Sequence, residues 1–122
     1  MDIKKIDKDF SVCKATDYSL VHFDDPYVFL GKTDAENTLV CITKNVPPNT
    51  TVREDGWKAF RIQGVLDFSW VGILSKISGL LAENNIGIFA ISTFDTDYFL
   101  TKKEHYQKAL EILHAAGYTI VA

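Results

Sequence analysis

The order of hydrophobic patterns in the second half of the chain constrains the fold more than any other sequence feature. Apolar strand-like segments alternate with segments whose apolar side chains recur at helical spacing. The first stripe includes Val71, Leu74, Ile77 and Leu81, and the second includes Tyr106 and Leu113. The predicted order is strand, helix, strand, strand, helix, strand, at residues 59–66, 71–81, 88–94, 98–101, 106–113 and 118–121.

The ends of both helices carry recognisable signals. Asn84 and Asn85 precede Ile86 and Gly87, and an Asn or Gly there can adopt the left-handed conformation that ends a helix. Residues 101–104 have the spacing of a capping box, which predicts the start of the second helix. Gly117 follows its last turn as a C-cap residue. Residues 88–94 are apolar on both faces, which is typical of a central strand.

This order predicts an α+β, ferredoxin-like fold: a four-stranded antiparallel sheet with two helices on one face. The first half adds strands at residues 10–15, 27–30 and 38–43, with a short helix or turn at residues 17–25. The last two strands form a hairpin, and Pro47-Pro48 marks a linker. We therefore predict two domains, a truncated βαββ unit at residues 1–52 and a complete βαββαβ unit at residues 53–122.

Composition narrows the functional classes. Hydrophobic residues make up 47% of the chain and charged residues 24%, as in a globular protein, and the net charge of −3 argues against a nucleic-acid partner. The first residues lack the apolar segment of a signal peptide, and no stretch is long enough to span a bilayer. We expect a cytoplasmic protein in which Cys13 and Cys41 are buried thiols without a disulfide.

The start of the first helix is the strongest candidate site. Asp67 and Ser69 are residue types that accept hydrogen bonds from the first N–H groups of a helix. Gly72 is predicted inside the first turn, where a bare backbone allows a small anion to approach the positive end of the helix. The alternatives are that Gly72, with Gly79, gives clearance for packing, and that Asp67 is only a helix cap.

Polar residues around the later hairpin give a second group of candidates. Asp95 is expected to form the turn, whereas Asp97 begins the returning strand and is the better candidate for ligand contact. Ser92 and Thr93 alternate across the sheet, so only one of them faces a given side. No metal-ligand spacing, phosphate loop or catalytic motif is present, so we expect no metal, no cofactor and no catalytic residue.

Two strings resemble a known family. Asp-Phe-Ser-Trp-Val-Gly-Ile-Leu at residues 67–74 and Ile-Phe-Ala-Ile-Ser-Thr-Phe-Asp-Thr-Asp-Tyr at residues 88–98 resemble bacterial tandem ACT-domain proteins, which are similar to CASTOR-type arginine sensors. The resemblance implies a sensor that binds free amino acids at an interface between ACT units. In it, backbone N–H groups meet the ligand carboxylate, and Asp97 faces the ligand's amino group or a basic side chain. The implied ligand-binding set is Asp67, Phe68, Ser69, Val71, Gly72, Ile73, Ser92, Thr93 and Asp97.

The sequence hypothesis is therefore a non-enzymatic regulatory protein that binds a free amino acid, within one chain or between two. A homodimer is expected, and a separate regulated protein is a possible partner. Two alternatives stay open. One is a structural protein–protein interaction module. The other is a small acyl-phosphate hydrolase, which requires an arginine in an anion-binding loop; Arg53 and Arg61 are the chain's two arginines.

Overall fold

The chain divides into two compact units in a computed structural model that describes residues 1–64 and 72–122. Unit 1 consists of Met1–Asp7 and Lys58–Ala122, and unit 2 consists of Lys8–Trp57. Two long strands, β1 (Asp2–Ala15) and β4 (Thr50–Ile62), contribute residues to both units. The predicted domain boundary after residue 52 stays a prediction.

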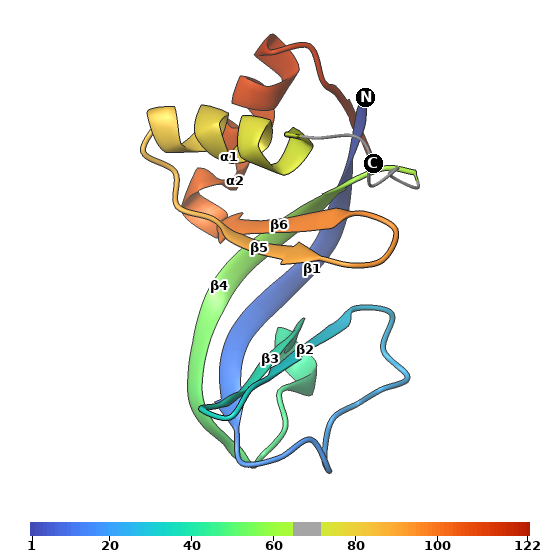
Figure 1. Ribbon diagram of the computed structural model, residues 1–122, viewed down its shortest axis with the longest axis vertical. Helices are drawn as coiled ribbons and strands as arrows, with labels where there is room; N and C mark the ends of the chain where they lie inside the picture. Colours follow the sequence, from blue (N-terminus) through green and yellow to red (C-terminus); the bar gives the residue numbers. More distant parts are fainter. Residues whose placement is uncertain (65–71) are drawn as a thin grey trace. The chain divides into compact units, whose positions relative to one another are not determined.

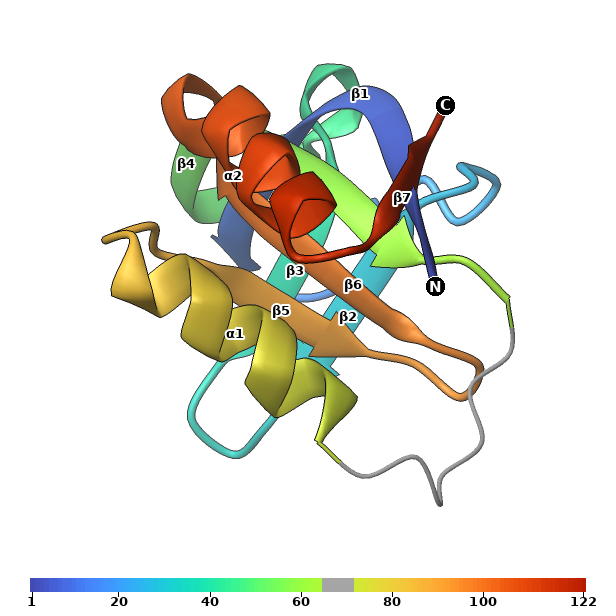
Figure 2. The ribbon, with the colours of Figure 1, turned by 90° about the horizontal axis from the view of Figure 1, so that it is seen from above.

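Unit 1 has the α+β, ferredoxin-like fold that the sequence predicted. After β4 the chain forms a helix, a hairpin, a second helix and a last strand, and Figures 1 and 2 show both helices on one face of the sheet. These elements are α1 (Ile73–Glu83), β5 (Phe89–Ser92), β6 (Asp97–Lys102), α2 (Lys103–Ala115) and β7 (Thr119–Val121). β5 and β6 pair antiparallel, as the predicted hairpin requires.

The sheet of unit 1 corrects two expectations. Its strand order is β7-β1-β4-β6-β5, so the start of β1 adds a strand to the predicted four, and β1 runs parallel to β7. Period-two alternation does not reveal this strand because Ile3 and Ile6, its buried residues, are three positions apart. β5 ends the order and is an edge strand, so the prediction of a central strand was wrong: the side chains of Ala90 and Ser92 are exposed.

The core of unit 1 lies between the helices and the sheet. Ile77 and Leu81 of α1 are fully buried, as the helical stripe predicted. Leu74 is 37% exposed, whereas Ile73 packs against the core, because Ile73 lies four residues before Ile77 and shares its face of the helix. The buried cluster contains Ile3, Phe60, Ile62, Ile77, Leu81, Ile86, Phe99, Ala109, Leu110, Leu113 and Tyr118.

Both helices end as the sequence predicted. Asn85 is left-handed at φ 59°, and the Ile86 N–H bonds the Leu81 carbonyl at 3.0 Å. Gly117 is left-handed at φ 103°, and the Tyr118 N–H bonds the Leu113 carbonyl at 3.1 Å. The predicted capping box is wrong, since β6 runs to Lys102 and α2 follows directly, without a side-chain cap hydrogen bond.

Unit 2 is built on the predicted hairpin. β2 (Val28–Lys32) and β3 (Asn37–Ile42) pair antiparallel, and β3 pairs antiparallel with β1. A single 3-10 turn, η1 (Thr43–Asn45), follows, whereas residues 17–25 form turns and no helix. Cys13 and Cys41 are free, buried thiols in a cluster with Leu39, which confirms the interpretation of both cysteines.

Candidate functional site

Gly72 sets the geometry of the helix start. Its φ is 88°, a left-handed conformation that glycine adopts without strain, and it is the N-cap residue of α1. Gly72 therefore lies just before the first turn of α1, whereas the sequence analysis predicted it inside that turn. Because α1 begins at Ile73, Gly72 also takes the cap position expected for Asp67. A Cβ built on Gly72 or Gly79 meets no described atom within 4 Å, so backbone conformation explains Gly72 better than packing clearance does.

The first turn of α1 presents backbone donors. The first hydrogen bond within the helix runs from the Lys76 N–H to the Gly72 carbonyl at 2.8 Å. The N–H groups of Ile73, Leu74 and Ser75 precede it and therefore have no partner inside the helix. Gly72 has no side chain to cap them, and the first turn carries no acidic residue. Such an end of a helix attracts an anion.

Four of the predicted site residues cannot be placed. Asp67, Phe68, Ser69 and Val71 lie outside the described residues. Their contact with a ligand stays a prediction.

The β5–β6 turn brings the remaining predicted residues together. Ser92 and Asp97 are paired across the strands, and the Ser92 hydroxyl donates to the Asp97 carboxylate at 2.7 Å. Thr93 lies beyond the end of β5, and its N–H and hydroxyl both donate to the Thr96 carbonyl. The Thr96 hydroxyl donates to the Ile62 carbonyl of β4 at 2.8 Å, which ties the turn to the sheet.

The helix start and the hairpin turn lie at the same end of unit 1, as Figures 1 and 2 both show. This end combines first-turn N–H groups that have no partner within α1 with a half-buried carboxylate, that of Asp97. Asp97 is the first residue of β6, the position at the strand start that the sequence predicted for it. The arrangement offers complementary groups for the two charged ends of a zwitterion.

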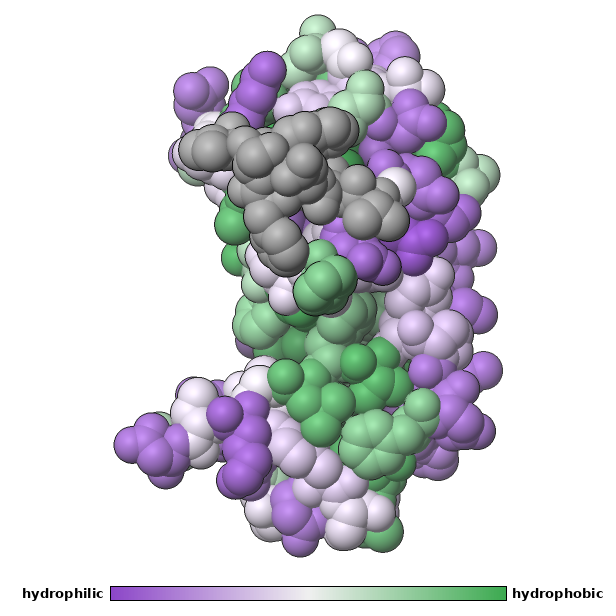
Figure 3. All heavy atoms as spheres, turned by 45° about the vertical axis from the view of Figure 1, so that its right-hand side comes forward, coloured by the Kyte–Doolittle hydropathy of each residue, from purple (hydrophilic) through white to green (hydrophobic). Residues whose placement is uncertain are grey.

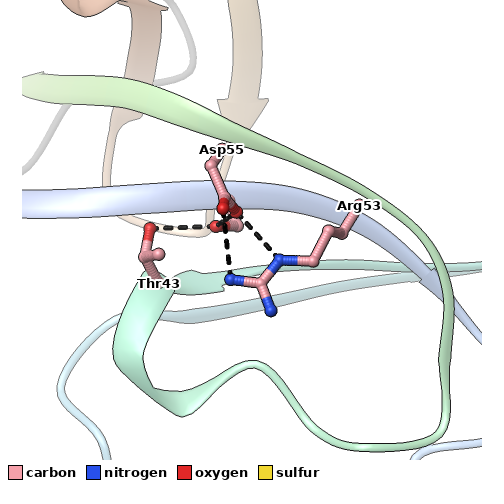
Figure 4. Close-up of polar contacts among 4 residues, drawn as sticks. Thr43, Arg53 and Asp55 are labelled. Atoms are coloured by element: carbon pink, nitrogen blue, oxygen red, sulfur yellow. Dashed lines mark hydrogen bonds and ion pairs between the residues drawn. The ribbon is translucent and has the colours of Figure 1, made fainter.

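Unit 2 contains a polar cluster that the sequence did not reveal (Figure 4). The Ser11 hydroxyl lies 2.9 Å from that of Thr43 and donates to the Asp55 carboxylate at 2.5 Å. Arg53 donates to both Asp55 oxygens, at 3.0 and 3.2 Å. The pKa of the Asp55 carboxyl is lowered, mainly by the hydrogen bond from Ser11 and next by those from Arg53. Ser11 is fully buried, so the cluster stabilises the fold and does not expose a nucleophile.

Both arginines of the chain are in β4, and neither lies in a loop. Arg61 donates to the Tyr98 hydroxyl at 3.0 Å, and its guanidinium lies 5.8 Å from the centre of the Tyr98 ring. The acyl-phosphate hydrolase alternative needs a loop arginine, so this placement removes its main support. Within residues 1–64 and 72–122, no three His, Cys, Asp or Glu side chains are arranged to hold a metal ion. No helix in these ranges is both long enough and apolar enough to cross a bilayer.

Comparison with known proteins gives one family match. The model of the ACT domain matches residues 52–115, which is more than half of the chain. No match was found among curated proteins.

Solved structures support the same fold over nearly the whole chain. The chain is similar to a protein from Agobacterium tumefaciens, with 27% identity, a TM-score of 0.84 and coverage of 98% of this chain and 91% of that chain. It is also similar to a Vibrio cholerae protein described as a possible transport protein, with 20% identity, a TM-score of 0.68 and coverage of 93% and 88%. The regulatory subunit of aspartate kinase from Thermus thermophilus has 10% identity, a TM-score of 0.66 and coverage of 96% and 97%. The last two likenesses show the fold alone.

Proposed function

Because the chain belongs to the ACT-domain family, we propose that it is a non-enzymatic regulatory protein that binds a free amino acid. The observation that carries this proposal is the start of α1, where the first-turn N–H groups have no partner within the helix and Gly72 has no side chain to cap them. The similarity to a regulatory subunit of aspartate kinase agrees with a regulatory role. The resemblance of residues 67–74 and 88–98 to tandem ACT proteins of the CASTOR type suggests the ligand class, free amino acids.

The binding mode follows from the charges at this end of unit 1. The ligand carboxylate accepts hydrogen bonds from the N–H groups around Gly72 and Ile73, and the predicted residues Asp67, Phe68, Ser69 and Val71 complete that wall. The ligand ammonium meets the Asp97 carboxylate, which Ser92 orients from the opposite strand. Thr93 holds the turn that sets the position of both residues. No covalent step is required.

A thermal-shift screen with the twenty amino acids, followed by calorimetry on each one that stabilises the protein, tests the proposal. A ligand at one hundred times its Kd stabilises the folded state by about 2.7 kcal/mol. Asp97→Asn is expected to weaken binding about tenfold or more, as for the loss of a charge-assisted hydrogen bond. Asp95→Asn is the matched control, because Asp95 is an exposed carboxylate of the same turn.

Two outcomes contradict the proposal. One is the absence of any stabilising amino acid at millimolar concentration. The other is an equal affinity of the Asp97→Asn and Asp95→Asn variants for the amino acid, which would show that the Asp97 carboxylate does not contact the ligand.

The proposal includes a cytoplasmic homodimer that acts on a separate protein. Exposed apolar side chains support self-association: Phe94, in the β5–β6 turn, is 82% exposed, and Figure 3 shows apolar residues at the surface. The free thiols of Cys13 and Cys41 agree with a reducing compartment. Light scattering after size-exclusion chromatography, with and without the amino acid, measures the mass. A monomer in both conditions refutes the dimer and leaves the binding proposal intact.

A further inference from the structure

Thr96 is a buried polar residue at the end of the turn that leads into β6, and it is 7% exposed. The turn is closed by its own hydrogen bonds. The Thr93 N–H and hydroxyl donate to the Thr96 carbonyl at 2.8 and 2.9 Å, and the Thr96 N–H donates to the Thr93 hydroxyl at 3.3 Å. The turn therefore moves as one piece, and Asp97 follows it directly.

The side chain of Thr96 joins this turn to β4. Its hydroxyl donates to the Ile62 carbonyl at 2.8 Å, and both residues are buried, so water cannot readily replace this hydrogen bond. Ile62 is the last residue of β4, and the N–H of the next residue, Gln63, donates to the Asp2 carbonyl in β1 at 2.9 Å. The end of β4 is therefore held on both sides, by β1 and by the turn.

Ile62 also links the turn to α1. Its side chain is fully buried and belongs to the same core cluster as Ile77 and Leu81, the two buried residues of α1. One residue of β4 thus shares the core of the helix through its side chain and holds the turn through its carbonyl. Because helix and turn are both fixed to β4, the sheet sets the distance from the first-turn N–H groups of α1 to the Asp97 carboxylate.

A fixed distance between these groups selects amino acids by the position of their ammonium. An α-amino acid carries its carboxylate and its ammonium on one carbon, whereas a β-amino acid has an additional carbon between them. A site whose donors and acceptor cannot move apart binds the longer spacing less tightly, since one charged group of the ligand then loses its partner.

We propose that Thr96 makes the site at the start of α1 selective for α-amino acids. Its hydroxyl positions the turn, and the turn places the Asp97 carboxylate at the spacing of an α-ammonium group. Thr96 acts through Asp97 and is therefore a positioning residue. This role rests on the proposed function, because it concerns the same site.

Calorimetry with a matched pair of compounds measures this selectivity. The pair consists of the L-α-amino acid with the largest thermal shift among the twenty and the β-amino acid with the same side chain. The unsubstituted protein is expected to bind the α form at least about tenfold more tightly. Thr96→Val removes the hydroxyl and keeps the shape of the side chain, so it should weaken the α form about tenfold and bring the two affinities within about threefold of each other. Thr96→Ser keeps the hydroxyl and should restore the selectivity.

Thr101→Val is the matched control. Thr101 is a fully buried threonine of β6, and its hydroxyl also donates to a backbone carbonyl, that of Lys102 at 3.2 Å. The control should keep the ratio of the two affinities at the value of the unsubstituted protein. If Thr96 only stabilised the fold, Thr96→Val would lower Tm and leave this ratio unchanged.

Amide chemical shifts of the unsubstituted protein provide a readout that does not depend on a variant folding. The α form should shift the amides of both Ile73 and Asp97, whereas the β form at the same concentration should shift only one of them. Three results overturn the role of Thr96 and leave the proposed function intact: equal affinities of the unsubstituted protein for the two forms, a ratio unchanged in Thr96→Val, and equal shifts of both amides by the two forms. The absence of binding by any of the twenty amino acids overturns both.

Discussion

Replacing Tyr106 with phenylalanine removes one hydroxyl from a position where α2 meets two strands. The hydroxyl donates to the Ala59 carbonyl at 2.6 Å, and the backbone of Ile6 also hydrogen-bonds it. Ala59 is 1% exposed, so water cannot easily replace the lost donor. The ring still packs near Phe60, whose centroid is 6.4 Å away, and the hydrophobic contact survives the substitution.

The expected cost follows from the group left without a partner. A buried backbone acceptor that loses its donor costs about 1–3 kcal/mol, and Tyr106 is only partly buried, so we expect a loss of about 1–2 kcal/mol for Tyr106→Phe. That loss lowers Tm by roughly 3–8 °C in a chain of this size. Tyr118→Phe is the matched control. The Tyr118 hydroxyl makes no hydrogen bond to the described residues, and its removal should change stability by less than about 0.5 kcal/mol.

The pH dependence adds a second test of the same hydroxyl. Burial, opposed by the Ile6 hydrogen bond and helped by Asp7, raises the pKa of Tyr106 to about 12 in the folded state. The unfolded value is about 10, so the folded state prefers the protonated phenol. Its contribution is complete below about pH 10 and is lost as the pH rises through 12. The stability difference between the two chains should therefore shrink across that window.

Urea denaturation at pH 7 and at several pH values above 9 measures both effects. If Tyr106→Phe lowers the free energy of unfolding by less than about 0.5 kcal/mol at pH 7, the backbone groups of Ile6 and Ala59 find other hydrogen-bond partners without the hydroxyl, and the reasoning is refuted. A stability difference that stays constant up to pH 12 would show that the hydroxyl is not buried in solution.

Three further predictions concern the backbone and the polar groups. Gly72→Ala should destabilise the fold by about 1–2 kcal/mol in urea denaturation, because alanine is strained at φ 88°, whereas Gly79→Ala inside α1 should stabilise it by about 0.5–1 kcal/mol. Asp55→Asn should lower Tm at pH 7. Since the folded pKa of Asp55 is depressed, the difference from the unsubstituted chain should vanish as the pH falls from the unfolded value through the folded one. Cys13 and Cys41 should react with a thiol reagent only at the rate of unfolding; rapid labelling in native buffer would contradict their burial.

The elements of unit 1 that the sequence predicted correctly depend on local chemistry. The helical stripes are visible because residues three and four apart share a face, and Ile77 and Leu81 are buried as that rule requires. Asn85 and Gly117 end the helices because their own backbones accept positive φ. The hairpin of β5 and β6 is also local, and Asp97 begins the second strand as expected.

The candidate site was predictable only in part. The sequence pointed to Gly72, but the residue lies before the helix, and its positive φ is a property of the chain path that no residue spacing reveals. Ser92 and Asp97 were both named as candidates, yet their hydrogen bond depends on the cross-strand register. The cluster of Ser11, Thr43 and Asp55 joins residues up to 44 positions apart, so no local pattern predicts it.

The sequence by itself determined the two helices, their ends and the ferredoxin-like order, because each depends on residues within a few positions of one another. Only the tertiary structure decided that β1 enters the sheet of unit 1, where Ile3 pairs with Ile120 across nearly the whole chain. The same pairing ends at Lys4, so residues 5–7 of β1 continue past the end of β7. Contacts between residues so distant in sequence leave no periodic signal, since they are selected by the packing of the complete unit and not by the local chain.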